Sequence, residues 1–141
     1  MFCYPEVEFL YPGLADKHVL RLSFHPDTRL DLINVPDIAK FVAAAFDSPS
    51  MYSGKEISLA AEKLTAAEMA EQLDAIANRK IAVELLDDAH ARRSAAQGDI
   101  VIDAQIWQRD IGYRVNIEAL RQYRIPLTPL AQALDKASIR W

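Results

Sequence analysis

The spacing of the glycines argues against a backbone turn that binds a dinucleotide pyrophosphate. A dinucleotide pyrophosphate needs closely spaced glycines at a strand-to-helix turn, where backbone N–H groups can approach the phosphates. The chain has four glycines, and they lie far apart at Gly13, Gly54, Gly98 and Gly112. The sequence therefore contains no recognisable pyrophosphate-binding turn of its own.

Side chains that bind metals or act as nucleophiles are also sparse. The three histidines, His18, His25 and His90, show no His-x-x-x-His or similar ligand spacing, so we expect no metal site. No nucleophile-elbow pattern surrounds a serine. Cys3 is the only cysteine, which excludes an internal disulfide, and the acidic residues that follow it disfavour a reactive thiolate.

Two charged pairs and a set of aromatic residues have ordinary structural explanations. Asp87 and Asp88 resemble a catalytic carboxylate pair, but acids are also favoured at a helix start, and we prefer that interpretation. Arg92 and Arg93 fit a solvated face better than an anion clamp. We expect the aromatic residues of the C-terminal third to serve core packing rather than base stacking; they are Trp107, Tyr113, Tyr123 and Trp141.

Composition limits the kinds of partner. The chain has 141 residues, the size of one domain, and 51% of them are hydrophobic, which is enough for a core. Its net charge of −4 argues against a general nucleic-acid binder. Residues 105–141 carry six basic and three acidic side chains, a local charge of +3, so residues 1–104 carry −7. We interpret the basic end as a solvated face, with anion binding as the alternative.

The sequence also bears on localisation. No positively charged segment precedes the first apolar residues, as a signal peptide requires. No stretch reaches the ~18–20 apolar residues of a membrane span. We therefore expect a cytoplasmic protein without membrane contacts.

Hydrophobic periodicity and turn residues predict the elements. We expect strands near residues 18–24, 30–35, 55–59 and 81–86. Residues 100–108 fit a strand or a helix, and we favour a helix. The other predicted helices cover residues 38–46, 65–77, 88–96 and 116–123, with a last one starting after a Thr128 cap with Pro129 in its first turn.

Two of these helices have clear sequence signals. The helix at 38–46 presents one apolar face, made of Ile38, Phe41, Val42, Ala45 and Phe46. The helix at 65–77 begins with the capping box Thr-Ala-Ala-Glu at 65–68 and ends near Asn78, which tolerates a left-handed backbone. The pattern predicts one mixed α/β domain over residues 1–141, helix-rich, with a small sheet of about four strands. Residues 1–17 are expected to be an irregular packing segment, and 100–141 a helical tail.

Several segments, in order, resemble the C-terminal half of the NmrA-like family, atypical members of the short-chain dehydrogenase/reductase superfamily. They are Leu-Ile-Asn-Val-Pro-Asp-Ile-Ala at 32–39, Ser-Pro-Ser-Met-Tyr-Ser-Gly-Lys-Glu-Ile at 48–57, Leu-Thr-Ala-Ala-Glu-Met-Ala at 64–70, Gly-Tyr-Arg-Val-Asn at 112–116 and Leu-Thr-Pro-Leu at 127–130. The resemblance implies a truncated Rossmann-type fold from an NAD(P)-binding superfamily. The glycine-rich half of the family, which would precede these segments, is absent.

The resemblance also suggests where function resides. The Tyr-x-x-x-Lys pair of classical relatives is absent, because Tyr52 and Lys55 have the wrong spacing. In the family this end of the chain shapes the substrate pocket and contributes to partner contacts. The resemblance therefore implies four ligand-pocket candidates, which are Tyr4, Tyr11, Phe24 and His25.

Three functional hypotheses follow. The first is a regulatory module that binds a small ligand or a protein, has no cofactor of its own, and forms a homo-oligomer or a complex because it exposes apolar surface. The second is a subunit or repurposed catalyst of an oxidoreductase-like or isomerase/cyclase-like enzyme, with NADP bound only if a partner supplies the nucleotide-binding half. The third is a remnant without function, which the regular helix signals argue against. Whether the chain is an enzyme stays open.

Overall fold

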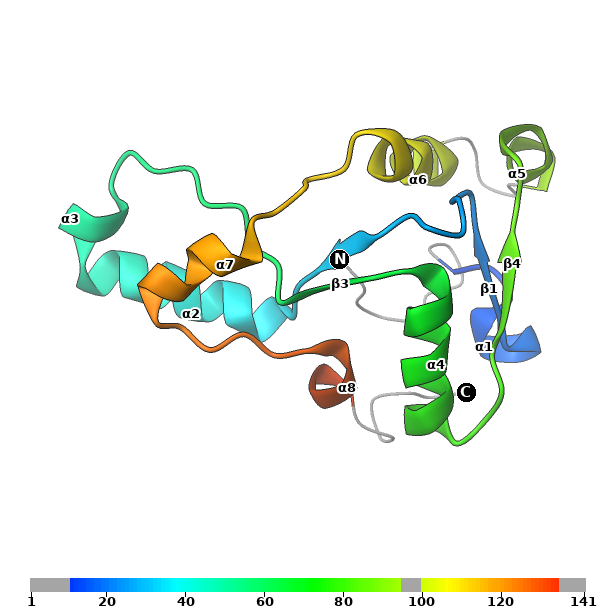
Figure 1. Ribbon diagram of the computed structural model, residues 1–141, viewed down its shortest axis with the longest axis horizontal. Coiled ribbons are helices and arrows are strands. Elements are labelled where there is room, and N and C mark those ends of the chain that lie inside the picture. The colour runs from blue at the N-terminus through cyan, green and yellow to red at the C-terminus, as the bar shows by residue number, and fades with distance from the viewer. Residues whose placement is uncertain (1–10, 95–99, 135–141) are drawn as a thin grey trace.

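The computed structural model describes residues 11–94 and 100–134, which form the mixed α/β, helix-rich fold expected from the sequence (Figure 1). The strands are β1 (Val19–Leu22), β2 (Leu30–Leu32), β3 (Glu62–Leu64) and β4 (Ala82–Leu85). The helices are α1 (Leu14–Lys17), α2 (Val35–Asp47), α3 (Pro49–Tyr52), α4 (Ala66–Ala77), α5 (Asp88–Ser94), α6 (Ile100–Asp110), α7 (Ile117–Leu120), the 3-10 turn η1 (Arg121–Tyr123) and α8 (Leu130–Ala133).

The four described strands form two ladders of two strands each. β1 pairs with β4 in parallel, and β2 pairs with β3 in the antiparallel sense. The register places Asp31 of β2 opposite Lys63 of β3. This pairing brings the turn after β1 and the start of β3 to the same part of the molecule, where a pocket forms.

The main core lies between the strands and α4. Its most deeply buried side chains include Leu20, Met69, Leu73 and Ile81. α4 is fixed at its start by the predicted capping box. Glu68 N–H donates to Thr65 Oγ1 (3.2 Å), and Thr65 N–H donates to Glu68 Oε2 (2.7 Å). The helix ends at Asn78 with a left-handed φ of 52°, also as predicted.

A second, smaller core joins α2, α3 and the chain around η1, at the left of Figure 1. Phe41 of α2 is buried there, with its ring edge-on to that of Tyr123 at a centroid distance of 5.6 Å. The Tyr123 ring stacks on Tyr52 at 5.3 Å. The core prediction is therefore confirmed for Tyr123, while Trp107 and Tyr113 contact each other at the surface and Trp141 lies outside the described residues.

The predicted apolar face of α2 is divided by the structure. Phe41 enters the second core, but Val42 is 51% exposed and Phe46 is 81% exposed. Successive helix residues point about 100° apart, so a narrow contact with η1 covers Phe41 and leaves Val42 on the outside. The sequence predicts one apolar face for these five residues, and the structure buries that face only in part, at Phe41.

Asp37 holds the buried side of α2 in place. Its fully buried carboxylate accepts hydrogen bonds from Thr128 N–H (2.6 Å), Thr128 Oγ1 (3.0 Å) and Lys40 Nζ (2.6 Å). Burial alone raises the pKa of Asp37, but the bonds from Lys40 and Thr128 outweigh it and hold that pKa below its ordinary value. The carboxylate thus links α2 to the segment before α8.

This use of Thr128 changes the predicted start of the last helix. Thr128 bonds to Asp37, so it does not cap α8; Pro129 is the N-cap, and Leu130 N–H donates to Glu62 Oε1. The strand predicted at 55–59 is also absent, because β2 pairs with residues 62–64 and the segment 55–60 packs on the second core without a ladder partner. Within 1–17, predicted as irregular, residues 14–17 form the one-turn helix α1.

Candidate functional site

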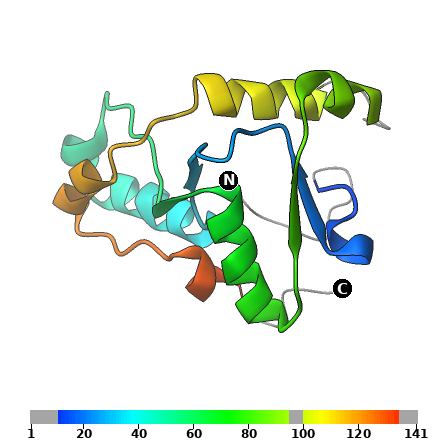
Figure 2. The ribbon, with the colours of Figure 1, turned by 45° about the vertical axis from the view of Figure 1, so that its right-hand side comes forward.

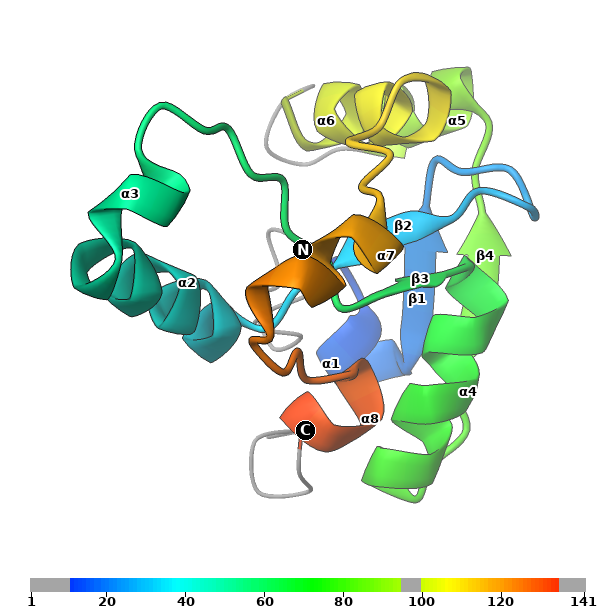
Figure 3. The ribbon, with the colours of Figure 1, turned by 60° about the vertical axis from the view of Figure 1, so that its left-hand side comes forward.

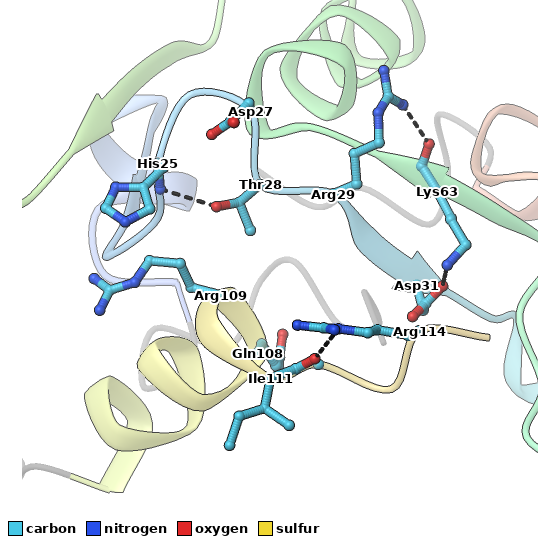
Figure 4. A pocket seen from close by; sticks show the side chains of 11 residues that line it. His25, Asp27, Thr28, Arg29, Asp31, Lys63, Gln108, Arg109, Ile111 and Arg114 are labelled. Carbon is cyan, nitrogen blue, oxygen red and sulfur yellow. Dashed lines mark hydrogen bonds and ion pairs between the residues drawn. The ribbon is translucent and has the colours of Figure 1, made fainter.

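A polar pocket of about 310 Å³ lies between the turn after β1, the β2–β3 ladder and the C-terminal end of α6. Figure 2 shows α6, in yellow, above this turn. Figure 4 shows the side chains that line the pocket from close by. The pocket is rich in ionisable side chains; the basic ones are His25, Arg29, Lys63, Arg109 and Arg114, and the acidic ones are Asp27 and Asp31.

The turn side of the polar pocket is set by local hydrogen bonds. His25 N–H donates to Thr28 Oγ1 (3.0 Å), and Thr28 N–H donates to His25 O (3.1 Å). These bonds close the turn and hold the exposed His25 at the pocket edge. On the adjacent ladder, the β2–β3 register aligns Asp31 and Lys63, whose charged groups meet at 2.7 Å.

The helix side of the polar pocket depends on how α6 attaches to β1. Ser23 N–H donates to the buried Gln105 Oε1 (2.8 Å), and the Arg109 guanidinium reaches Ser23 O (3.4 Å). Arg109 also forms ion pairs with Asp88 (2.6 Å) and Asp110 (2.7 Å). The hydrogen bonds to Asp110 and Asp88 raise the pKa of Arg109 further, and the same bonds lower the pKa of both carboxyls.

The cations of the polar pocket differ in their partners. Arg29 binds both carboxylate oxygens of Glu68 at 3.2 Å, while Lys63 and Arg109 pair with the carboxylates named above. Arg114 instead donates to two carbonyls at the end of α6, Ile111 O (2.7 Å) and Asp110 O (3.1 Å). Figure 4 shows its guanidinium extending into the pocket. Among the residues described, no carboxylate forms an ion pair with Arg114.

The structure separates the four pocket candidates derived from the sequence. His25 lines the polar pocket, whereas Phe24 is buried in the main core and Tyr11 packs against that core. Tyr4 lies outside the described residues. Sequence reasoning did not select Arg29, Lys63 or Arg114 for this site. The available signals were the Arg-x-Asp alternation at 29–31 and an arginine two residues after Gly112, at a helix end.

A second surface feature lies on the outside of α2. An apolar groove of about 520 Å³ is formed by Val35, Ile38, Ala39, Val42, Ala43 and Phe46, which we call the outer face of α2. None of these side chains carries a charge or a hydrogen-bonding group. Such a face cannot bind a polar ligand, but it suits contact with another apolar surface.

Other kinds of site find no support in the part of the chain that the structure describes. It has no cluster of three or more His, Cys, Asp or Glu side chains placed to hold a metal ion. None of its helices is both long and apolar enough to cross a membrane. Its glycines with positive φ, Gly13, Gly54 and Gly112, lie in separate turns rather than in one.

Comparisons with known proteins agree with the resemblance noted in the sequence. The NmrA-like family model matches residues 12–106. An NmrA-like family domain-containing protein from Dictyostelium discoideum is 24% identical over 80 residues, which are 57% of this chain and 26% of the relative. The aligned region thus spans about a quarter of that relative's length. Because the family model covers well over half of the sequence, the chain belongs to the NmrA-like family.

Proposed function

We propose that this NmrA-like chain is a small-ligand-binding module that holds a small polar molecule through a carboxylate or phosphate group in the polar pocket. The observation that carries the proposal is Arg114, whose guanidinium enters the pocket with only carbonyl partners among the described residues. A charge-assisted bond to an anion is about twice as strong as a neutral one. A bound anion therefore gives Arg114 the charged partner that the described residues do not provide.

The other cations of the polar pocket support the same ligand class. Arg29 and Glu68 are both substantially exposed, and such pairs contribute little to stability, so Arg29 can turn toward an anion at low cost. Lys63 also lines the pocket, but its ion pair with Asp31 offsets much of its positive charge. The orientation of a ligand would then depend mainly on Arg114, with Thr28 and Gln108 as neutral hydrogen-bonding groups.

Size favours a small ligand. Ligand pockets in proteins measure roughly 300–1,000 Å³, and the polar pocket, at about 310 Å³, lies at the lower end. It suits a metabolite-sized acid better than a dinucleotide. We therefore also propose that the chain alone does not bind NAD(P), an interpretation supported by the separation of its glycines.

A titration followed by ¹⁵N-¹H NMR tests both statements. Inorganic phosphate, succinate and NADPH are added separately to the 15.8 kDa chain. We expect phosphate or succinate to shift the backbone signals of residues 25–31, 63 and 108–114. Removal of the positive charge by Arg114→Gln should weaken that binding at least about fivefold, since a charge-assisted bond is lost.

The matched control is Arg121→Gln, which removes an equal charge from the same basic segment but outside the polar pocket. It should leave the affinity unchanged. Equal loss in both variants would mean that anions bind the basic segment without a site, and the ligand proposal would fail. Saturable micromolar binding of NADPH, visible in the intrinsic fluorescence of Trp107 and Trp141, would overturn the statement about NAD(P).

One observation favours a second function, protein binding. The outer face of α2 is apolar and exposed, as expected for a module that works in an assembly. A partner that supplies a nucleotide-binding half would make the chain a subunit of an oxidoreductase-like or isomerase/cyclase-like enzyme. Co-purification with such a partner, followed by NADPH binding of the complex, would support this alternative.

A further inference from the structure

The outer face of α2 is an apolar surface that the described residues leave unpartnered. Figure 3 shows α2 at the edge of the molecule, with α7 beside it. The contact with η1 covers Phe41, while Val35, Val42 and Phe46 stay exposed on the outside of the helix. These exposed side chains belong to the same groove, together with Ile38, Ala39 and Ala43.

The charges of α2 do not oppose contact at this face. Asp37 is buried on the other side of the helix and paired with Lys40, and none of the three charged residues of α2, Asp37, Lys40 and Asp47, lines the groove. An approaching surface therefore needs to remove water only from apolar groups, which is favourable. Two identical faces can approach each other without bringing like charges into the contact.

We propose that the outer face of α2 binds the same face of a second copy of the chain, with the two helices antiparallel. The pattern of large and small residues carries this inference. Phe46 and Ala39 are seven residues, or two turns, apart, and Val42 is followed by Ala43. A two-fold axis between Val42 and Ala43 places each Phe46 over Ala39 of the second copy and each Val42 beside Ala43 of the second copy.

This arrangement satisfies the requirements of a symmetric dimer. A two-fold interface must be self-complementary, and here one helix supplies both the large side chain and the small residue that accommodates it. Antiparallel helices also bring opposite ends of their dipoles together, whereas parallel helices oppose like ends. In a parallel pair Phe46 would meet Phe46, which leaves no space for either ring.

The exposed area predicts the strength of the contact. Phe46 offers about 150 Å², and the half-exposed Val35 and Val42 add about 130 Å², judged from typical side-chain areas. Two copies would then bury about 560 Å² from these side chains alone, and the neighbouring groups bring the total toward the roughly 1,200 Å² of small specific interfaces. We therefore expect a reversible dimer of micromolar affinity. This inference does not depend on the polar pocket.

Sedimentation equilibrium of the full chain, from low to several hundred micromolar, tests the dimer. The average mass should rise with concentration from 15.8 kDa toward twice that value. Phe46→Glu should remain monomeric, with an unchanged circular dichroism spectrum. Ile100→Glu, which changes an equally prominent residue (71% exposed) on α6, should dimerise like the original chain. A mass of 15.8 kDa at every concentration would overturn the proposal.

Single cysteines test the orientation, in a background in which Cys3→Ser removes the native thiol. Val42→Cys lies beside the proposed axis and should form a disulfide with its own counterpart under mild oxidation, because the two Cβ atoms come close. Val35→Cys should not, because the two copies of that position lie about 20 Å apart in an antiparallel pair. Efficient cross-linking at Val35, or a dimer that persists in Phe46→Glu, would contradict the proposed contact.

Discussion

The polar pocket and the outer face of α2 differ in whether their side chains find partners within the same chain. In the pocket, Lys63 and Arg109 already have carboxylate partners from β2, α5 and α6, and Arg114 has two carbonyls. On α2, the part of the chain that the structure describes leaves Val42 and Phe46 largely uncovered. The first region can exist in an isolated chain, whereas the second gains from another surface.

The difference reflects two kinds of interaction. A charged side chain can be satisfied by one group at the right distance, and water satisfies whatever remains. The free energy gained by covering an apolar face is proportional to the area that is removed from water. In this structure the charged groups therefore find nearby partners, whereas part of the apolar surface of α2 stays exposed to water.

The two sides of α2 should respond very differently to the loss of an aromatic ring. Phe41→Ala removes a ring from the second core and should lower the free energy of unfolding by about 3–4 kcal/mol, through lost burial and the cavity left against Tyr123. Phe46→Ala removes an exposed ring and should change it by less than about 0.5 kcal/mol. Urea denaturation at low micromolar concentration, where the monomer dominates, measures both.

Equal destabilisation by Phe46→Ala and Phe41→Ala at that concentration would contradict this prediction. Such a result would show that α2 already buries its outer face within one chain. A loss for Phe46→Ala that appears only at high concentration would instead reflect dimer dissociation, since binding to the native state adds to the measured stability.

The second prediction concerns the polar anchor of α2 and its dependence on pH. Asp37→Asn removes the charge that Lys40 and Thr128 bind, and it should cost about 2–3 kcal/mol near neutral pH. Because the folded-state pKa of Asp37 is lowered, its contribution is complete above the ordinary carboxyl pKa of about 4 and is lost as the pH falls through the folded-state value. The stability difference between the two proteins should therefore shrink below about pH 4.

Thermal unfolding of both proteins over a pH series measures this effect. Asp47→Asn is the matched control, because Asp47 is the exposed last residue of the same helix. This variant should show none of the loss of stability expected for Asp37→Asn near neutral pH, because no hydrogen bond or ion pair between the Asp47 side chain and the other described residues is removed. A difference for Asp37→Asn that stays constant through the acid range would exclude titration of Asp37 as the cause.

Local signals predicted the elements of this chain better than its contacts. Thr65 and Glu68 satisfy each other within one helical turn, so the start of α4 could be identified from the sequence. The alternation at 55–59 is as regular as that of a strand, but a ladder requires a partner, and β2 pairs with 62–64 instead. For α2, periodicity identified an apolar side but not the width of the surface that would cover it.

The polar pocket was less predictable for the same reason. His25 was selected, but Arg29, Lys63 and Arg114 come from three separate segments. They converge because of the β2–β3 register and because Gln105 attaches α6 to the end of β1. Both are tertiary contacts with no counterpart in local spacing.

The last and smallest predicted effect compares a glycine of the polar pocket with a glycine outside it. Gly112 in the polar pocket and Gly54 beside α3 both have positive φ, at 61° and 71°. Gly54→Ala adds a methyl group to open space, so it should cost only the conformational strain, about 1 kcal/mol. In Gly112→Ala the new Cβ would lie 2.9 Å from Gln108 O, and this backbone atom cannot move without disturbing the end of α6.

We therefore expect Gly112→Ala to cost about 2 kcal/mol in chemical denaturation, roughly twice the effect of Gly54→Ala. It should also weaken phosphate or succinate binding severalfold, since a shift of the α6 end displaces Arg114 from the pocket. Gly54→Ala should leave that affinity unaltered. If both variants lose the same stability and bind the anions equally well, the α6 end does not position Arg114, and the polar pocket is less rigid than its hydrogen bonds indicate.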